Sequence, residues 1–329
     1  MGRTYAVFAG ALVAGLLSAG IAQAQWKPGD KIVLKVANSQ PNQSIYAIGV
    51  GHKKIIEEKL PGVRLELIAT QGGDENVQLM QAGEVQLGNA NSVAPYSAHH
   101  GKFQNEGKAP DRKIMGFFPA YTWEIGLMVA PDSPIKTFRD IVGKRIATGP
   151  VGSGAAATFG ELQKSLDLTD ASFSRVQRSA PQQGLNNLVA GSIDGVIWGT
   201  AHPAGVILEK VATNGLKFVP FDPEDVKKVA ANYPYYHVGA LRANTYDKQT
   251  SEVPWIGGST HFWIHADVNA ELVYAMTKAL WENRQVLHET HSSQKLLDEA
   301  MVRQQANLLP FHPGAQRYFQ EAGILKAKP

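Results

Sequence analysis

The 329-residue chain contains no cysteine. This absence excludes disulfide bonds, thiolate nucleophiles and zinc sites built on cysteine. The chain also lacks runs of like charge, because its 32 Lys and Arg residues are interspersed with 29 Asp and Glu residues. That distribution argues against nucleic acid as a partner. Burial of apolar surface must therefore stabilise the fold, and a chain of this length can supply it.

Sequence signatures of common enzymes are missing as well. Ser153 has glycine on both sides, but in the wrong register for a Gly-x-Ser-x-Gly nucleophile elbow. Two histidine pairs, His261 with His265 and His288 with His291, have spacings that a helix would place on one face. Neither pair matches His-Glu-x-x-His, so we expect packing or surface roles, no metal and no cofactor. An exported enzyme acting on a small organic acid remains an alternative, as does a secreted adhesin without a small ligand.

The only long apolar run of the sequence lies at its N-terminus. Arg3 precedes an apolar run over residues 6–21, and Ala22-Gln23-Ala24 has the small-x-small pattern of a signal-peptide cleavage site. The run is too short and too rich in small residues for a comfortable membrane span. We therefore expect residues 1–24 to be a signal peptide and the mature protein to be soluble in the periplasm. Removal of Arg3 lowers the formal net charge from +3 to +2. An uncleaved anchor is the alternative.

Glycine is plentiful, and three glycines lie in one turn over residues 149–155. The turn follows an expected strand at 145–148 and opens an expected helix at 155–166. Glycine lets the backbone approach a ligand closely, and a helix N-terminus offers free N–H groups and the positive end of its dipole. The turn lacks the Lys of a phosphate-binding loop, and its glycine spacing differs from the dinucleotide fingerprint. We interpret it as a seat for a small anion, with Ser153 and Gly154 at its centre.

A pattern of strand, turn and helix occurs twice along the chain. The first unit has expected strands at 32–37, 65–69 and 85–88 and helices at 45–58 and 75–81. The second unit has expected strands at 145–148, 173–176 and 195–198 and helices at 155–166 and 182–190. A crossing strand is expected at 123–129, a return crossing from 233–237, and C-terminal helices at 270–291 and 296–307.

Strands that alternate with helices predict parallel sheets, with ligands outside the carboxyl ends of the strands. Two such units predict an α/β protein of two lobes with a cleft between them, as in type II-like periplasmic binding proteins. We expect residues 25–122 to form the first part of lobe 1 and residues 123–238 to form lobe 2. Residues 239–329 would return to lobe 1 and supply the C-terminal helices.

Polar turns at the expected cleft supply candidate ligand contacts. Gly72 and Gly73 leave room for a ligand, and Asn76 offers an amide. The alternative for this segment is a helix start capped by Asp74, and the capping and ligand-binding roles are compatible. Asn89 and Asn91 follow the next expected strand, where small-molecule contacts concentrate; a plain turn is the alternative.

Aromatic residues form a second group of candidates for the wall of a pocket, although such residues more often pack in the hydrophobic core. They are Tyr46, Trp123, Trp198, Tyr235 and Tyr236. Trp198 is the strongest of them, because it ends a strand beside a polar turn that contains Thr200 and His202. His202 precedes a proline, so it is either a ligand donor or a turn residue. Arg178 suggests either a salt bridge to a ligand or a solvated surface side chain.

Seven stretches of the chain resemble the TAXI family of solute-binding proteins, which serve tripartite ATP-independent periplasmic (TRAP) transporters. The stretches are residues 44–49, 70–76, 143–147, 152–154, 199–203, 233–236 and 311–315. They run in family order across almost the whole mature chain. Residues 40–44 contain less glycine than the family pattern, Gly73 stands where serine is common, and Ala155 stands where threonine is usual.

The resemblance implies a two-lobed receptor that closes on a small organic anion and delivers it to a membrane permease driven by an ion gradient. Family ligands are amino acids such as glutamate, dicarboxylates and related oxo- or hydroxy-acids. The contacts that the resemblance implies are Ser44, Tyr46, Gly72, Gly73, Asn76, Ser153, Gly154, Thr200 and His202. A monomer without catalytic residues is expected. The departures fall where a ligand would be touched, so the ligand can differ from the best-known one of the family.

Overall fold

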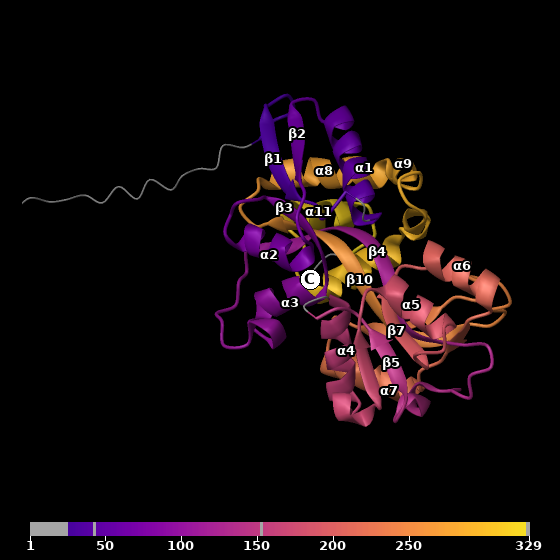
Figure 1. Cartoon of the computed structure of the whole chain (residues 1–329). Coiled ribbons are helices and arrows are strands. Elements are labelled where there is room, and N and C mark those ends of the chain that lie inside the picture. Colours follow the sequence, from indigo (N-terminus) through magenta and orange to yellow (C-terminus); the bar gives the residue numbers. More distant parts are fainter. Residues whose placement is uncertain (1–25, 42–43, 152–153, 327–329) are drawn as a thin grey trace, which may run out of the picture.

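The computed structural model describes residues 26–41, 44–151 and 154–326. These residues form two α/β lobes, as the sequence predicts, and the lobes lie one above the other in Figure 1. Within the described residues, ten strands form one sheet. Its main path runs in the order β2 (Val63–Ile68), β1 (Ile32–Ala37), β3 (Leu87–Asn91), β10 (Val253–His265), β4 (Ile114–Val129), β7 (Gly195–Thr200), β5 (Arg145–Thr148) and β6 (Arg175–Arg178). None of the described helices is long and apolar enough to span a membrane.

The first lobe is built on three parallel strands flanked by helices. The strands are β1 (Ile32–Ala37), β2 (Val63–Ile68) and β3 (Leu87–Asn91), and the helices that connect or follow them are α1 (Ser44–Lys59), α2 (Gly73–Gln81) and α3 (Val93–His100). Four C-terminal helices complete this lobe, namely α8 (Ala270–Glu282), α9 (Arg284–Leu287), α10 (Glu299–Leu308) and α11 (Pro313–Glu321). Apolar residues of α1, α8 and α11 share one buried core with those of β1 and β2.

The second lobe repeats this plan. Its parallel strands are β5 (Arg145–Thr148), β6 (Arg175–Arg178) and β7 (Gly195–Thr200), with α4 (Gly154–Ser165), α5 (Pro181–Val189), α6 (Gly205–Asn214) and α7 (Pro223–Asn232) around them. Two short strands, β8 (Lys217–Val219) and β9 (His237–Leu241), pair with β4 and β10. This lobe has a separate hydrophobic core, centred on residues such as Phe138, Ile146, Phe159 and Leu185.

Two long antiparallel strands, β4 (Ile114–Val129) and β10 (Val253–His265), run through both lobes and join them. Phe117 and Phe118 at the start of β4 pack in the core of the first lobe. Leu127 and Met128 near its end pack in the core of the second lobe. The sheet is therefore continuous, whereas the core is divided. Such a construction allows bending between the lobes with little loss of packing inside either one.

Several expectations about individual elements need correction. Residues 233–236 form a turn, and the return crossing is β10, which pairs antiparallel with β4 over Ile256–His265. The expected helix at 270–291 is interrupted at Asn283, whose φ of −110° and ψ of 19° lie outside the helical region. His261 and His265 lie on β10 rather than on a helix. Strand β3 runs from Leu87 to Asn91 instead of over residues 85–88, because residues 87–91 pair with β10.

Candidate functional site

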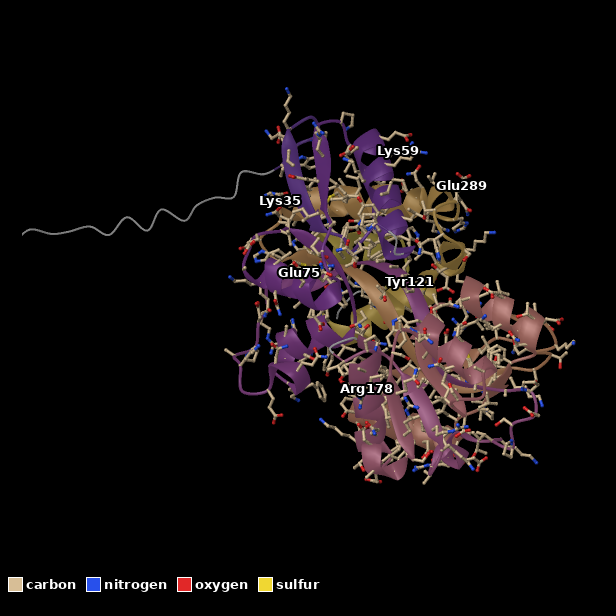
Figure 2. The ribbon with its side chains drawn as sticks, in the orientation of Figure 1. Lys35, Lys59, Glu75, Tyr121, Arg178 and Glu289 are labelled. Atoms are coloured by element: carbon tan, nitrogen blue, oxygen red, sulfur yellow. The ribbon has the colours of Figure 1, made fainter. Side chains whose placement is uncertain are left out.

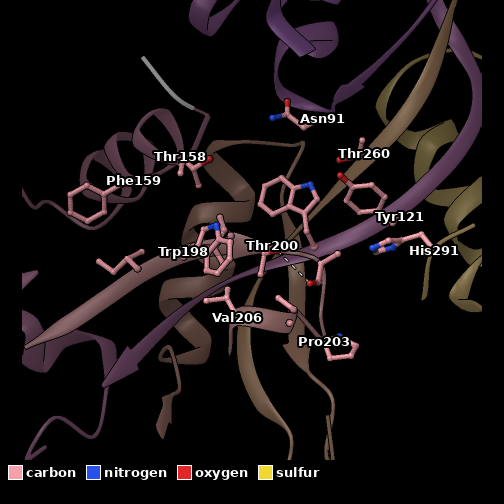
Figure 3. Close-up of a pocket in the computed structure, with 18 residues that line it drawn as sticks. Asn91, Tyr121, Thr158, Phe159, Trp198, Thr200, Pro203, Val206, Thr260 and His291 are labelled. Carbon is pink, nitrogen blue, oxygen red and sulfur yellow. Dashed lines mark hydrogen bonds between the residues drawn. The ribbon is translucent and has the colours of Figure 1, made fainter. Parts of the chain in front are cut away.

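A cavity of about 500 Å³ lies between the lobes (Figure 3). Its lining comes from the carboxyl ends of β3 and β7, the first turns of α4 and α6, and the crossing strands β4 and β10. The lining residues are Asn91, Tyr121, Trp123, Ile125, Ala155, Thr158, Phe159, Ile197, Trp198, Gly199, Thr200, Ala201, Pro203, Ala204, Gly205, Val206, Thr260 and His291. Carboxyl ends of parallel strands are where α/β proteins of this kind bind ligands, so the position suits a binding site.

The crossing strand β4 supplies the floor of the cavity. Trp123 and Ile125 line it, whereas Thr122 and Glu124 face a second cavity of about 40 Å³ on the opposite side of the strand, and Tyr121 contributes to both cavities. This division follows from the alternation of side chains along a β-strand. A Cβ atom at Gly258 on β10 would overlap the Trp123 indole ring, so glycine there makes room for the tryptophan. Tyr121 lies at the junction of the lobes (Figure 2) and forms a hydrogen bond with Thr260.

The second lobe contributes the end of β7 and the start of α6. Trp198, Thr200 and Val206 lie on the side of the cavity opposite Asn91 in Figure 3. Helix α6 begins at Gly205 without a side-chain cap. The N–H groups in the first turn of a helix have no intrahelical acceptor, so those of Gly205 and Val206 are available at the cavity. This end of α6 also carries the positive end of the helix dipole.

Helix α4 contributes Thr158 and is held in place by a buried polar cluster. The Tyr235 hydroxyl donates to Glu161 Oε1 at 2.7 Å, and the Tyr236 hydroxyl donates to Glu161 Oε2 at 2.6 Å. The Tyr236 hydroxyl also lies 3.2 Å from Thr158 Oγ1. Burial raises the pKa of Glu161, against the opposing effect of the two tyrosine hydrogen bonds. The cluster ties the first turns of α4 to the turn at residues 233–236, and thereby orients Thr158.

In the first lobe, a buried amide network supports the loops behind Asn91. Asn76 Nδ2 donates to the Asn89 carbonyl oxygen at 2.7 Å, and Asn89 Nδ2 donates to Asn38 Oδ1 at 2.9 Å. Ser39 Oγ donates to Asn89 Oδ1 at 3.0 Å. Asn91 itself uses Oδ1 to accept from the Val93 N–H at 3.1 Å, which leaves its NH₂ group for the cavity. The network fixes β3, and Asn91 presents its amide at the end of that strand.

The structure places the predicted site residues in three groups. Trp123, Trp198 and Thr200 line the cavity. Asn76 and Asn89 are buried in the amide network and Tyr236 in the Glu161 cluster, so their polar groups already have partners within the protein. The sequence alone does not distinguish a ligand contact from a structural contact, because an asparagine after a strand can form hydrogen bonds with a ligand or with another loop.

The remaining predicted residues lie around the cavity or outside the described part of the chain. Gly72 is the N-cap of α2, and Gly73 lies against Ala90 of β3, neither of them among the lining residues. The predicted cap by Asp74 is wrong, because Asp74 lies inside the first turn of α2 and the helix has no side-chain cap. Tyr46 is in the first turns of α1, and His202 faces the smaller cavity behind β4. Ser153 lies outside the described residues, as does the side chain of Ser44; Gly154 begins α4 directly before the lining residue Ala155.

Several lining residues were missed in the sequence. Tyr121 and Thr260 come together only because β4 and β10 pair, with Thr260 opposite Tyr121. Thr158, Phe159, Val206 and His291 lie on helices or connections whose orientation no local pattern reveals. Among the described residues, no group of three or more His, Cys, Asp or Glu side chains is arranged to hold a metal ion.

Residues 40–323 match the NMT1-like family. The chain belongs to this family. Its structure is similar to that of a TctC solute-binding protein from Polaromonas, with 12% sequence identity, a TM-score of 0.56, and coverage of 85% of this chain and 97% of the other. It is also similar to the periplasmic sulfonate-binding protein SsuA from Methylobacillus flagellatus, with 17% identity, a TM-score of 0.50, and coverage of 91% and 89%. Both are binding proteins rather than enzymes, and at these identities the likeness establishes the fold.

Proposed function

We propose that this member of the NMT1-like family is a periplasmic receptor that captures a small organic anion between its lobes. The cavity carries the proposal, because both lobes and both crossing strands contribute to its lining. A ligand that touches both lobes stabilises the closed arrangement by its differential contacts, and its release allows reopening. The continuous β4–β10 ribbon with its divided core suits this motion.

The anion is held by backbone dipoles and neutral side chains in this proposal. The first turns of α4 and α6 reach the cavity, as do the Asn91 amide and the hydroxyl groups of Thr158, Thr200 and Thr260. Helix N-termini attract anions through their N–H groups and dipoles. Such a site neutralises charge without a fixed ion pair, which suits reversible capture.

We further propose the finer assignment that the sequence resemblance implies, namely a TAXI-type receptor of a TRAP transporter. Residues 1–24 would direct export and be removed after Ala24, and the loaded receptor would dock on a membrane permease as a monomer. Lobe 1 would comprise residues 25–122 and the C-terminal helices, and lobe 2 residues 123–238. The return to lobe 1 would occur along β10, since Trp255 and Ile256 still pack in the core of lobe 2.

A thermal-unfolding screen of the mature protein tests the receptor function. The panel contains amino acids, dicarboxylates, oxo-acids and aromatic acids, with chloride and phosphate as controls. A ligand at a hundred times its dissociation constant stabilises the folded state by about 2.7 kcal/mol. No shift with any organic anion would refute the receptor function.

The site is tested by replacing Ser153 with Phe, which adds bulk at the residue that precedes α4 in the sequence. We expect the ligand-induced shift to vanish while the unfolding temperature of the free protein changes little. Val142, which is exposed in the same lobe, supplies the matched control Val142→Phe. A retained response in the Ser153 variant would place the ligand elsewhere.

A further inference from the structure

The cavity between the lobes is rich in rings and hydroxyl groups. Tyr121, Trp123, Phe159 and Trp198 supply four aromatic side chains. Among the residues that the structure describes, no Asp, Glu, Lys or Arg lines it. Two internal dipeptides lie outside the residues that the structure describes, and neither carries a charge: Asn-Gln at 42–43 and Gly-Ser at 152–153. The chemistry of this lining restricts the class of anion that fits.

A free amino acid bound in this cavity would find no anionic side chain to pair with its ammonium group. The two acidic side chains closest in sequence to lining residues of β4 and α4 are both turned elsewhere. Glu124 faces the opposite side of β4, and the carboxylate of Glu161 is held by Tyr235 and Tyr236. Taking an ammonium ion out of water without an anionic partner is costly, and a cation–π contact recovers only part of that cost.

A dicarboxylate has the opposite difficulty, because its second negative charge lacks a permanent cation. His291 lines the cavity, but burial lowers the pKa of its imidazole and so disfavours the charged form. Arg178 at the end of β6 is the candidate, labelled in Figure 2. Its Nη2 atom already donates to both carboxylate oxygens of Asp170, at 3.0 and 2.9 Å. Recruitment of Arg178 by a ligand would therefore break an ion pair that the protein makes for itself.

A flat ring with one acidic group matches what the cavity offers. Its volume of about 500 Å³ falls within the range of about 300–1,000 Å³ that is typical of small-molecule pockets. Tryptophan faces stack well on aromatic rings, in offset or edge-to-face arrangements. The starts of α4 and α6, with Thr158, provide donors for a single carboxylate or similar group. The Thr200 hydroxyl donates to the Ala201 carbonyl oxygen at the long distance of 3.4 Å, a weak bond that a ligand oxygen can replace.

We infer that the ligand is an aromatic monoanion, whose ring packs between Trp123 and Trp198 and whose acidic group binds at the starts of α4 and α6. This inference rests on the proposed receptor function and narrows it to one class of organic anion. The glutamate-like and dicarboxylate ligands that the family resemblance implies would then bind weakly or not at all.

Isothermal titration of the mature protein at pH 7 tests the inference with a matched set of probes. Benzoate and 4-hydroxybenzoate represent aromatic monoanions, cyclohexanecarboxylate removes aromaticity, benzamide removes the charge, and terephthalate adds a second charge. Glutamate and succinate represent the alternative classes. We expect benzoate or 4-hydroxybenzoate to bind at least tenfold more tightly than each of the other five.

Variants of Trp198 test whether the preference for aromatic monoanions depends on this ring. Trp198→Ala should weaken binding of the aromatic monoanion at least tenfold, and Trp198→Phe by no more than about threefold, because a ring is kept. Trp198→Leu replaces the Ala variant if that one does not fold, with the same expectation. Trp281→Phe, in the core of the first lobe, is the control and should leave affinity unchanged.

The outcomes distinguish a failure of the aromatic assignment from a failure of the receptor function. Tighter binding of glutamate or succinate than of benzoate would overturn the aromatic assignment and leave the receptor function standing. Equal binding of benzamide would overturn the anionic part of the inference. An unchanged affinity in Trp198→Ala and Trp198→Leu would place the ring elsewhere and overturn the site. Failure of every organic anion to bind would refute the receptor function itself.

Discussion

Replacement of Glu124 by Gln should stabilise the protein at neutral and alkaline pH. Glu124 faces the cavity of about 40 Å³ behind β4, together with His202, Arg242 and Thr245. Burial raises the pKa of Glu124 from 4.5 to about 7, and the positive charge of Arg242 offsets only part of that effect. The folded protein therefore holds a proton at a pH where the unfolded chain has already released it.

The sign and size of the effect follow from this difference in pKa. Between pH 4.5 and 7 the unfolded state binds fewer protons than the folded state, so the free energy of unfolding falls as the pH rises. A shift of about 2.5 units corresponds to about 3.4 kcal/mol at 1.36 kcal/mol per unit. Partial solvent exposure of Glu124 lowers the expected loss to about 2–3 kcal/mol, present in full above pH 7 and absent below pH 4.5.

Urea unfolding from pH 4.5 to pH 8, followed by tryptophan fluorescence, measures the effect. We expect Glu124→Gln to exceed the wild type in stability by about 2–3 kcal/mol at pH 8, with the gap closing as the pH falls to 4.5. The difference in stability between the variant and the wild type cancels the contributions of other titrating groups. His202 is one of them, since burial lowers its pKa to about 4. Glu84→Gln, at an exposed position, is the control. A gap that does not change with pH, or that matches the control, would refute the reasoning.

Three further substitutions test the packing around the cavity. Tyr236→Phe removes a buried hydrogen bond to Glu161, so it should lower the free energy of unfolding, measured in urea, by about 1–3 kcal/mol. A loss under about 0.5 kcal/mol would mean that the cluster does not hold α4. Gly258→Ala places a methyl group where the Trp123 ring lies, so it should displace the ring and weaken ligand binding in titration calorimetry; unchanged affinity would contradict the role of Trp123. Gly160→Ala, inside α4 with open space around the new Cβ atom, should stabilise the protein by about 0.5–1 kcal/mol, and a destabilised variant would show that α4 is constrained at this point.

The repeated pattern of strand, turn and helix was readable from the sequence because its causes are local. Strands β1 and β5 have the predicted bounds, and α4 and α5 differ from prediction by one residue at each end. Alternating apolar residues, glycine at turns and polar helix starts act over a few neighbouring residues, so they remain visible without the fold. Trp198 and Thr200 follow from the same logic, since they end a parallel strand and line the cavity.

Pairing between distant segments was decided by the tertiary structure. The sequence contained no local signal that β10 would lie between β3 and β4, or that Thr260 would face Tyr121. Asn76 and Asn89 have the residue type and position of ligand-binding amides, yet each finds its partners in a neighbouring loop. Hydrogen-bond partners depend on which loops meet in space, and that is set by sheet order.

The sequence by itself determined the class of the fold, the two-lobed plan and the end of the parallel strands at which the cavity lies. Those properties follow from the repeated pattern of strand, turn and helix. Only the tertiary structure decided which side chains form the cavity and that no charged one lines it within the described residues. The physical reason is that charge and shape at a site are sums over segments far apart in the chain, and the β4–β10 ribbon brings those segments together.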